Sequence, residues 1–248
     1  MAKKFRIYQI LAESGMIRSK KEAVVLARAG KISVDGKKIE SLHYQINPKK
    51  KKITVDGKEI NLILEKKYFI LNKPKGIETT KENILKLIED KKIVDSKILP
   101  TMYPVGRLDK ETTGLLIVTN DRKLGNKILN PESKLKKVYI ARINRKIDDF
   151  EIDKLRKGVF IDLEENGVIT KYKTKPAEIN LKDGFVEVII SEGKKRQIRR
   201  MFESIKCKVL ELKRTAIGKL QLGELKEKEF TEFKKDDIYS LLFDEPRK

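Results

Sequence analysis

Two copies of an Asp-Gly turn place a strong constraint on the fold of the first sixty residues. In each copy the turn lies between two short β-rich runs, in "KISVDGKKI" at residues 31–39 and in "KKITVDGKEI" at residues 51–60. An Asp-Gly pair accepts the positive φ angles that a two-residue hairpin turn requires. The pattern therefore predicts two β-hairpins, and two copies are too few to indicate a solenoid.

Two short helices are predicted ahead of these hairpins. Apolar residues in "FRIYQILAESG" repeat at helical spacing, and Gly15 provides a stop. The second helix should begin at Ser19, which can form a capping box with Glu22, and it should end at Gly30. Its apolar face is predicted to consist of Val25, Leu26 and Ala29.

The charge of the chain indicates a polyanionic partner. The formal net charge is +21, and an excess of this size needs counter-charge in the working complex. A membrane-surface protein would show an amphipathic helix with bulky apolar anchors, which we do not find, and tryptophan is absent. RNA or DNA is therefore favoured. The lysine run at residues 49–52 fits a solvated turn on its own, but its cationic neighbours favour a phosphate-facing surface.

Cysteine and histidine are too scarce for a disulfide framework or for a metal site. Cys207 lies in an apolar alternation and is expected to be a core residue, and His43 is expected to be structural. No metal is therefore predicted. No apolar run is long enough to span a membrane, and the N-terminus lacks the apolar core of a signal peptide, so a cytoplasmic protein is expected. Nucleotide-cofactor motifs are absent.

The remainder of the chain mixes strands and helices in a way that predicts an α+β fold. Strands are predicted in "KYFILNK", "GLLIVT", "KKVYIARI", "FVEVIIS" and "KVLELKRTAI", and helices in "ENILKLIE", "RKLGNKIL", "DDFEIDKLRK" and "KKRQIRRMFESI". Several strands are adjacent in sequence, so a mixed, largely antiparallel sheet fits best. We predict one domain at residues 1–62 and a second at residues 66–248.

Asp109, in "YPVGRLDKETTGLLIVTND", is the leading candidate for a reactive group. An aspartate in such a place is commonly a turn residue that pairs with a neighbouring cation. Pro104 and Gly106 would fix its approach, however, and Gly114 would allow close access before a buried strand. Arg107 and Lys110 would help to keep the carboxylate ionised. These features predict a nucleophile on a stiff support.

A glycosidase is one alternative, because Glu111 lies two residues after Asp109 and could be its acid partner. Sugar-binding sites usually offer aromatic platforms, whereas aromatic residues are 6% of this chain and tryptophan is absent. The strongly positive charge also disfavours this alternative.

A second candidate segment is "EGKKRQIRRMF", which is predicted to be a helix that opens at residues 192–195. Arg196, Arg199 and Arg200 lie off its apolar stripe and could form a charged outer face, which is common. Three arginines near a helix N-terminus would also make a phosphate site. Arg199, at the edge of the stripe, could instead point inward and pair with a buried carboxylate.

Residues 4–60 resemble the S4 RNA-binding module, a small fold of two helices and a β-hairpin. The matching stretch is "FRIYQILAESGMIRSKKEAVVLARAGKISVDGKKI". The resemblance implies that this unit binds RNA shape and phosphates and performs no chemistry itself. The RNA-facing cations that it implies are Arg18, Lys20, Lys21 and Arg28.

"LNKPKG", "GRLDKETTGLLIVTND", "KKVYIARI" and "EGKKRQIRRMF", in this order, resemble the ribosomal small-subunit and large-subunit branch of the pseudouridine synthases. The resemblance extends from residue 4 to about residue 235. It implies that Asp109 attacks C1′ of a uridine or helps to form a glycal, and that the uracil turns before its C5 bonds to C1′. Tyr139 would stack on the uracil, and Arg199 would form an ion pair with Asp109.

The resemblance also implies RNA contacts and the lack of any cofactor. The residues expected to contact RNA in the second domain are Lys73, Arg107, Lys195, Arg196 and Arg200. Tyr139 could alternatively be a packed core residue of a strand, and Lys73 a simple turn lysine. Extrusion of the target base costs a few kcal/mol, which phosphate contacts can offset.

The prediction is thus a ribosomal RNA pseudouridine synthase, with 23S more favoured than 16S rRNA, acting on rRNA or a pre-ribosomal particle, without a membrane partner and as a monomer. The alternative is a non-catalytic RNA-binding or ribosome-assembly factor with the same fold. The sequence does not identify the target uridine. The C-terminal "LLFDEPRK" carries no motif that we can interpret.

Overall fold

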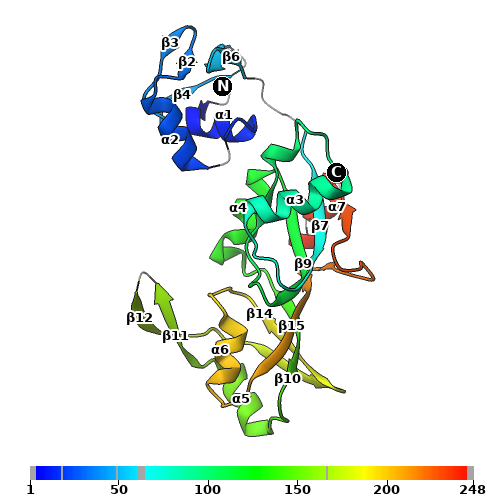
Figure 1. The fold of residues 1–248 in the computed structure, drawn as a ribbon. Helices are drawn as coiled ribbons and strands as arrows, with labels where there is room; N and C mark the ends of the chain where they lie inside the picture. Colours follow the sequence, from blue (N-terminus) through cyan, green and yellow to red (C-terminus); the bar gives the residue numbers. More distant parts are fainter. Residues whose placement is uncertain (1–3, 18, 49, 61–64, 166, 245–248) are drawn as a thin grey trace. The chain divides into compact units, whose positions relative to one another are not determined.

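The fold is described here from a computed structural model that covers residues 4–17, 19–48, 50–60, 65–165 and 167–244 (Figure 1). The predictions on Arg18, Lys49 and residues 245–248 lie outside the described residues. The chain divides into two compact units. The first consists of residues 1–66 and 84–103, and the second of residues 67–83 and 104–248.

The N-terminal part of the first unit contains both predicted helices and both predicted hairpins. Its elements are β1 (Phe5–Arg6), α1 (Ile7–Glu13), α2 (Lys20–Arg28), β2 (Ile32–Val34), β3 (Lys37–Lys38), β4 (Gln45–Ile46), β5 (Ile53–Val55) and β6 (Lys58–Glu59). Asp35 and Asp56 have φ angles of 48° and 51°, as their tight turns require. The two hairpins join through β2 and β5 into a four-stranded sheet in the order β3-β2-β5-β6.

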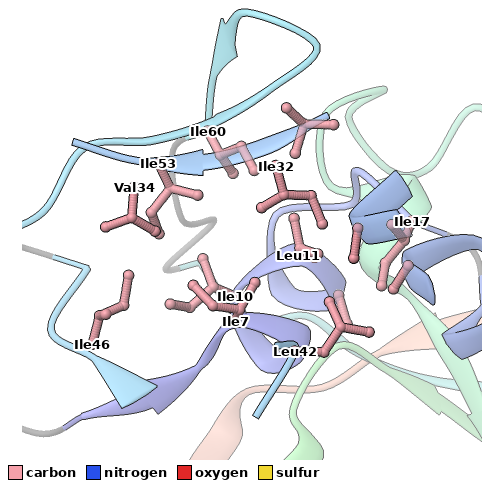
Figure 2. Packing of buried hydrophobic residues seen from close by; sticks show 14 residues of the cluster. Ile7, Ile10, Leu11, Ile17, Ile32, Val34, Leu42, Ile46, Ile53 and Ile60 are labelled. Atoms are coloured by element: carbon pink, nitrogen blue, oxygen red, sulfur yellow. The ribbon is translucent and has the colours of Figure 1, made fainter. Parts of the chain in front are cut away.

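A hydrophobic core joins these helices to the sheet, as Figure 2 shows. Its side chains come from α1, from the two hairpins and from the intervening loop, and they include Ile7, Leu11, Ile32 and Ile53.

The predicted apolar face of α2 is wrong at Val25, which is 65% exposed, and at Ala29, which is also exposed, whereas Leu26 is partly buried and packs against the core. Ala23 and Ala27, four residues apart on the helix, are buried. The small alanine side chains let the helix backbone approach the core. The predicted start is confirmed, since the Ser19 Oγ accepts a hydrogen bond from the Glu22 amide at 3.2 Å.

The second unit is built on a nine-stranded sheet with the order β13-β14-β10-β15-β9-β7-β17, to which β16 and β8 add. Its strands are β7 (Tyr68–Lys73), β8 (Tyr103–Val105), β9 (Thr112–Thr119), β10 (Lys137–Ile143), β13 (Glu178–Lys182), β14 (Phe185–Ile190), β15 (Val209–Ile217), β16 (Leu220–Gln221) and β17 (Phe230–Glu232). Strands β15 and β9 are parallel, and the other neighbours in the order are antiparallel. The predicted fold class, with a mixed and largely antiparallel sheet, is confirmed.

The predicted helices are present as α3 (Lys81–Lys91), α4 (Arg122–Leu129), α5 (Asp149–Lys157) and, with a later start, α6 (Gln197–Glu203), whereas α7 (Lys235–Phe243) was not predicted. Residues 84–91 of α3 and the 3-10 turn Leu99–Thr101 belong to the first unit, and the 3-10 turn Pro131–Ser133 belongs to the second. Asp121 caps α4 by accepting hydrogen bonds from the amides of Lys123 and Leu124. Helix α5 ends at Gly158, which has a φ angle of 86°. Among the described residues, no helix has both the length and the apolarity needed to cross a bilayer.

The hairpin formed by β11 (Phe160–Glu165) and β12 (Val168–Lys173) was not predicted. It forms a two-stranded sheet of its own, and Figure 1 shows it beside α6. Phe160, Val168 and Ile169 are exposed on it. Its outward apolar residues remove the alternation of apolar and polar positions by which a half-buried strand is recognised.

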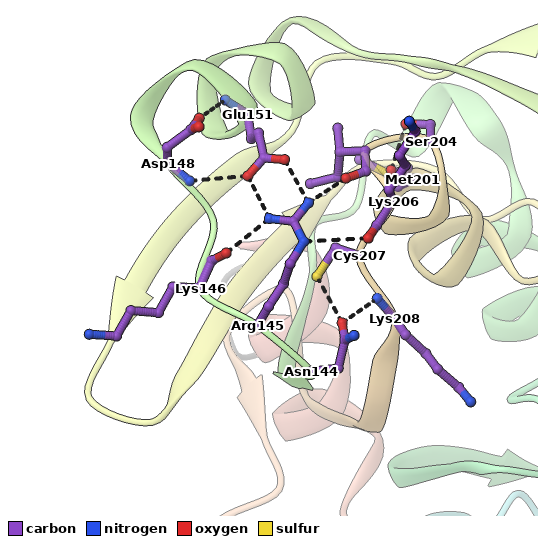
Figure 3. A network of polar contacts seen from close by, with 11 residues as sticks. Asn144, Arg145, Lys146, Asp148, Glu151, Met201, Ser204, Lys206, Cys207 and Lys208 are labelled. Carbon is purple, nitrogen blue, oxygen red and sulfur yellow. Dashed lines mark hydrogen bonds and ion pairs between the residues drawn. The ribbon is translucent and has the colours of Figure 1, made fainter.

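A network centred on Arg145 joins the end of β10 to α5 and to the segment between α6 and β15 (Figure 3). The Arg145 guanidinium donates to both oxygens of Glu151, at 2.9 and 2.6 Å, and to the carbonyl oxygen of Ile205 at 2.5 Å. Glu151 also accepts a hydrogen bond from the Asp148 amide, which completes a capping box on α5. Bidentate contacts of this kind are stronger than single ion pairs.

We expect Glu151→Gln to remove part of the acid sensitivity of folding. The hydrogen bond from Arg145 lowers the pKa of Glu151 to about 2. A depressed folded-state pKa stabilises the fold above the unfolded value, near 4.5, and this contribution is lost as pH falls toward 2. Urea unfolding between pH 5 and 2 should therefore show a smaller decline in stability for the variant than for the wild type, and equal declines would contradict the assignment.

Candidate active site

The Asp109 carboxylate is presented by a tightly bonded turn between β8 and β9. Gly106 begins the turn with a φ angle of 75°, and the Thr112 amide donates to the Asp109 carbonyl oxygen at 3.0 Å. Thr79 bonds Leu108 in both directions, since its hydroxyl donates to the carbonyl oxygen at 2.7 Å and accepts from the amide at 3.1 Å. The Asp109 side chain itself is partly exposed and bonds to no other group among the described residues. The backbone on either side of Asp109 is therefore fixed by hydrogen bonds, while its carboxylate is free to contact a substrate.

The prediction that Lys73 contacts RNA is wrong. Lys73 is fully buried, and its ammonium donates to the carbonyl oxygens of Pro74 and Ile77 at 2.8 and 2.7 Å, and to that of Lys110 at 3.4 Å. Burial lowers its pKa to about 8, while the charges of Glu111, Asp109 and Glu227 raise it. An ammonium that is enclosed in this way does not reach a phosphate in solvent. Instead it ties the segment after β7 to the Asp109 turn.

A cavity of about 720 Å³ opens in front of Asp109. The predicted residues that line it are Asp109, Tyr139, Arg107, Lys195 and Arg196. Tyr139 lies on β10 and is 8% exposed, so it forms part of the buried wall. The structure therefore brings the candidate nucleophile and the candidate stacking tyrosine to one cavity of a size typical for small ligands.

Arg199 lies behind this cavity instead of lining it. It is 7% exposed, and its guanidinium donates to the carbonyl oxygens of Val209 at 2.8 Å and of Glu111 at 3.3 Å. Within the described residues it forms no ion pair with Asp109, so that expected contact is not made in this structure. Burial lowers the pKa of Arg199, and the nearby charge of Asp109 acts in the opposite direction. The Arg199 side chain thus supports the Asp109 turn by donating to the main-chain oxygen of Glu111. Its positive charge also interacts with the negative charge of Asp109.

The predicted start of the arginine-rich helix is wrong. Helix α6 begins at Gln197, and Arg196 before it has a φ angle of 54°, so residues 192–194 are irregular and residues 195–196 form a turn. The Glu192 carboxylate holds this turn by accepting hydrogen bonds from Tyr172, the Lys175 amide and Gln197, at 2.5, 2.9 and 2.7 Å. These contacts hold the chain in a non-helical path before α6. Lys195 and Arg196 consequently project at the cavity as an exposed cationic rim.

Arg200 does not line the first cavity. It lines a different cavity of about 440 Å³, together with Phe160, Ile169 and Glu203. The three arginines of the motif thus have three environments: Arg196 at the rim, Arg199 buried behind Asp109, and Arg200 near the β11–β12 hairpin.

Two residues that line the first cavity were missed by the sequence analysis. Lys137 lies on β10 two residues before Tyr139, and Arg214 lies on β15 directly opposite Tyr139. Arg214 is 4% exposed, and its Nε donates to the Leu115 carbonyl oxygen at 2.8 Å. Its guanidinium lies 6.0 Å from the centre of the Tyr139 ring. The only sequence signal of an arginine within a strand is its alternation with apolar residues. This signal is too weak to distinguish a buried arginine from one that faces solvent.

Glu111, the acid partner of the glycosidase alternative, is not placed for that reaction. Glu111 is exposed and does not belong to the cavity lining, and its carboxylate pairs with Lys75 at 3.6 Å. In the described part of the chain, no three histidine, cysteine or acidic side chains come close enough to hold a metal ion. The cavity lining contains the carboxylates of Asp109 and Glu78, the Tyr139 ring and several cations, and a carboxylate beside cations suits nucleophilic attack on a substrate that carries phosphates.

In the first unit, Lys20, Lys21 and Arg28 of α2 are exposed. None of the three forms an ion pair within the residues that the structure covers. Their charges are therefore available to an external anion, and their contact with RNA stays a prediction.

Comparison with known proteins gives two family matches. Residues 67–204 match the RNA pseudouridylate synthase family, and residues 5–51 match the S4 domain. A crystal structure of a pseudouridylate synthase superposes with a TM-score of 0.66 at 27% sequence identity, and the match covers 96% of this chain and 100% of that one.

Several curated relatives resemble the chain over nearly its full length. An uncharacterised RNA pseudouridine synthase of Aquifex aeolicus is 33% identical, with 95% of this chain and 93% of the relative covered. The ribosomal large subunit pseudouridine synthase B of Bacillus subtilis is 33% identical, with coverages of 89% and 88%. The ribosomal small subunit pseudouridine synthase A of Yersinia pestis is 28% identical, with coverages of 79% and 81%.

Proposed function

The chain belongs to the RNA pseudouridylate synthase family, and we propose that it isomerises one uridine, or a few, in ribosomal RNA of the large subunit. The observation that carries this proposal is the cavity that both Asp109 and Tyr139 line, with Arg199 bonded to the main chain of the Asp109 turn at Glu111. The enzymes of this family are isomerases, so the reaction needs neither a second substrate nor a redox partner.

We assign the chemical steps to three residues. The Asp109 carboxylate attacks the sugar at C1′ or assists formation of a glycal, and the N1–C1′ bond breaks. The uracil turns within the cavity and C5 bonds to C1′, while the Asp109–C1′ bond breaks or, in the glycal route, the C2′ proton that Asp109 removed returns. The C5 proton is then lost with the help of Tyr139, and N1 gains a proton. Arg199 keeps the Asp109 turn in place through its hydrogen bond to the Glu111 carbonyl oxygen. Water-excluding walls such as Tyr139 strengthen electrostatic effects in the cavity.

The two parts of the chain would have separate functions, RNA binding and catalysis. Residues 1–62 would bind the RNA through the exposed cations of α2, and residues 66–248 would carry the catalytic cavity, with Arg107, Lys195 and Arg196 on the phosphates near the target. A cytoplasmic monomer that acts on rRNA or a pre-ribosomal particle is consistent with this division.

We expect the triple variant Lys20→Gln, Lys21→Gln, Arg28→Gln to lower the salt dependence of RNA binding. The slope of log K against log salt should become shallower by about 0.7 for each phosphate contact that is lost. Filter binding of an unmodified rRNA transcript at several salt concentrations measures this slope. A control with Lys154, Lys157 and Lys182 changed to glutamine has the same charge change on exposed residues outside the cavity lining, and an equal shift in both variants would refute the role of α2.

We choose large-subunit RNA because of the similarity to the Bacillus subtilis enzyme, which is a large-subunit synthase. The Yersinia pestis relative is a small-subunit synthase, so small-subunit RNA is the alternative. The test is carbodiimide-dependent reverse-transcription mapping of rRNA from a strain that lacks the gene, compared with the complemented strain. We expect one stop, or a few, to disappear from 23S rRNA. A loss confined to 16S rRNA would transfer the assignment to the small subunit.

A further inference from the structure

Lys137 and Arg214 form a pair of cations inside the cavity that the proposed chemical steps do not use. Lys137 lies two residues before Tyr139 on β10, and Arg214 is paired with Tyr139 across the β10–β15 ladder. Both side chains line the cavity that contains Asp109. The two cations therefore flank the aromatic wall against which the target base would stack.

Neither cation has a carboxylate partner among the described residues. The Lys137 ammonium donates to one neutral group, the carbonyl oxygen of Leu135, at 3.2 Å. Arg214 donates to the Leu115 carbonyl oxygen and, at 3.5 Å, to the Tyr139 hydroxyl, and its buried Nη2 has no partner. A buried charged donor without a partner is costly, so such a group points to a ligand.

The two charges also act on each other. Burial lowers the pKa of Lys137, and the charge of Arg214 lowers it further, while Glu192 raises it. Glu192 is already occupied, because it accepts hydrogen bonds from Tyr172, the Lys175 amide and Gln197. Two like charges that line one cavity, with the Glu192 carboxylate engaged elsewhere, are stabilised when an anion enters between them.

We propose that Lys137 and Arg214 form an anion subsite that binds a phosphate of the target nucleotide while its base lies against Tyr139. The inference rests on the proposed function, because it takes the occupant of the cavity to be a nucleotide of RNA. An ammonium and a guanidinium together match a phosphate, which accepts several charge-assisted hydrogen bonds. The subsite would fix the position of the sugar, so that Asp109 meets C1′ instead of solvent.

The subsite can be tested by comparing the binding of 5′-UMP and uridine to the full-length protein, measured by NMR titration. We expect the wild type to bind 5′-UMP more tightly than uridine by about ten-fold or more, as for hydrogen bonds to charged groups. Lys137→Met should bring this ratio close to one, and Lys137→Arg should retain most of it. Arg214→Lys, which keeps the charge of the buried position, should lower the ratio without abolishing it.

Lys136→Met is the matched control, since the neighbouring Lys136 is exposed and pairs with Glu178. It should leave the ratio at the wild-type value. The proposal is overturned if the wild type does not distinguish the two ligands, if Lys137→Met keeps the ratio, or if it weakens both ligands equally, which would place the base at this site. Because the ratio needs no turnover, its result is independent of whether pseudouridine is formed.

Discussion

Asp109→Asn should abolish pseudouridine formation and leave the protein folded and able to bind RNA. We expect the rate to fall by about 10⁴-fold or more, which is typical when a catalytic nucleophile is removed. The asparagine has the same shape, but its amide cannot attack C1′. The Asp109 side chain makes no hydrogen bond or ion pair with other described groups, so its replacement removes no structural contact. Release of tritium from C5-labelled uridine in unmodified rRNA transcripts measures the rate.

The control for this prediction is Glu111→Gln. The Glu111 carboxylate lies outside the cavity lining and pairs with Lys75, and Arg199 binds its main-chain oxygen, which the substitution retains. We expect activity near that of the wild type. Modification of RNA by the Asp109→Asn variant at the wild-type rate would remove Asp109 from the mechanism. If the wild type modifies no RNA, and both it and Asp109→Asn restore ribosome assembly equally, the chain is a non-catalytic assembly factor.

Gly114→Ala should have the largest effect on stability. Gly114 has a φ angle of 102°, and a Cβ atom built on it would lie 2.2 Å from the Arg214 carbonyl oxygen and 2.7 Å from the Arg214 nitrogen. These are backbone atoms of β15, so they can move only if the parallel pair of β9 and β15 separates. We expect a loss of about 3–5 kcal/mol in the free energy of unfolding, measured by urea denaturation.

Gly184→Ala is the matched control for the backbone term. Gly184 has a φ angle of 81°, but no atom lies within 4 Å of the position of its Cβ. Its substitution should therefore cost only the backbone strain, about 1–2 kcal/mol. An equal loss in the two variants would show that the close approach of β9 and β15 is not what requires glycine at residue 114.

The sequence determined the local elements because their signals are local. The Asp-Gly turns, the serine cap of α2, the stop of α5 at Gly158 and the apolar run of β9 each depend on a few neighbouring residues. The signal for Asp109 is also local, because the glycines on either side of it indicate an unusual turn. Motif order added Tyr139 and Arg199, which no spacing or composition could connect to Asp109.

The tertiary structure decided the role of each cation, because a charged side chain has the same sequence signal whether it is buried or exposed. It placed Lys73 under the Asp109 turn, Arg199 behind that turn, and Arg200 beside a different cavity. It also brought Lys137 and Arg214 together from strands more than seventy residues apart. Burial and the nearest partner fix what a cation does, and both depend on the pairing of strands that are distant in sequence.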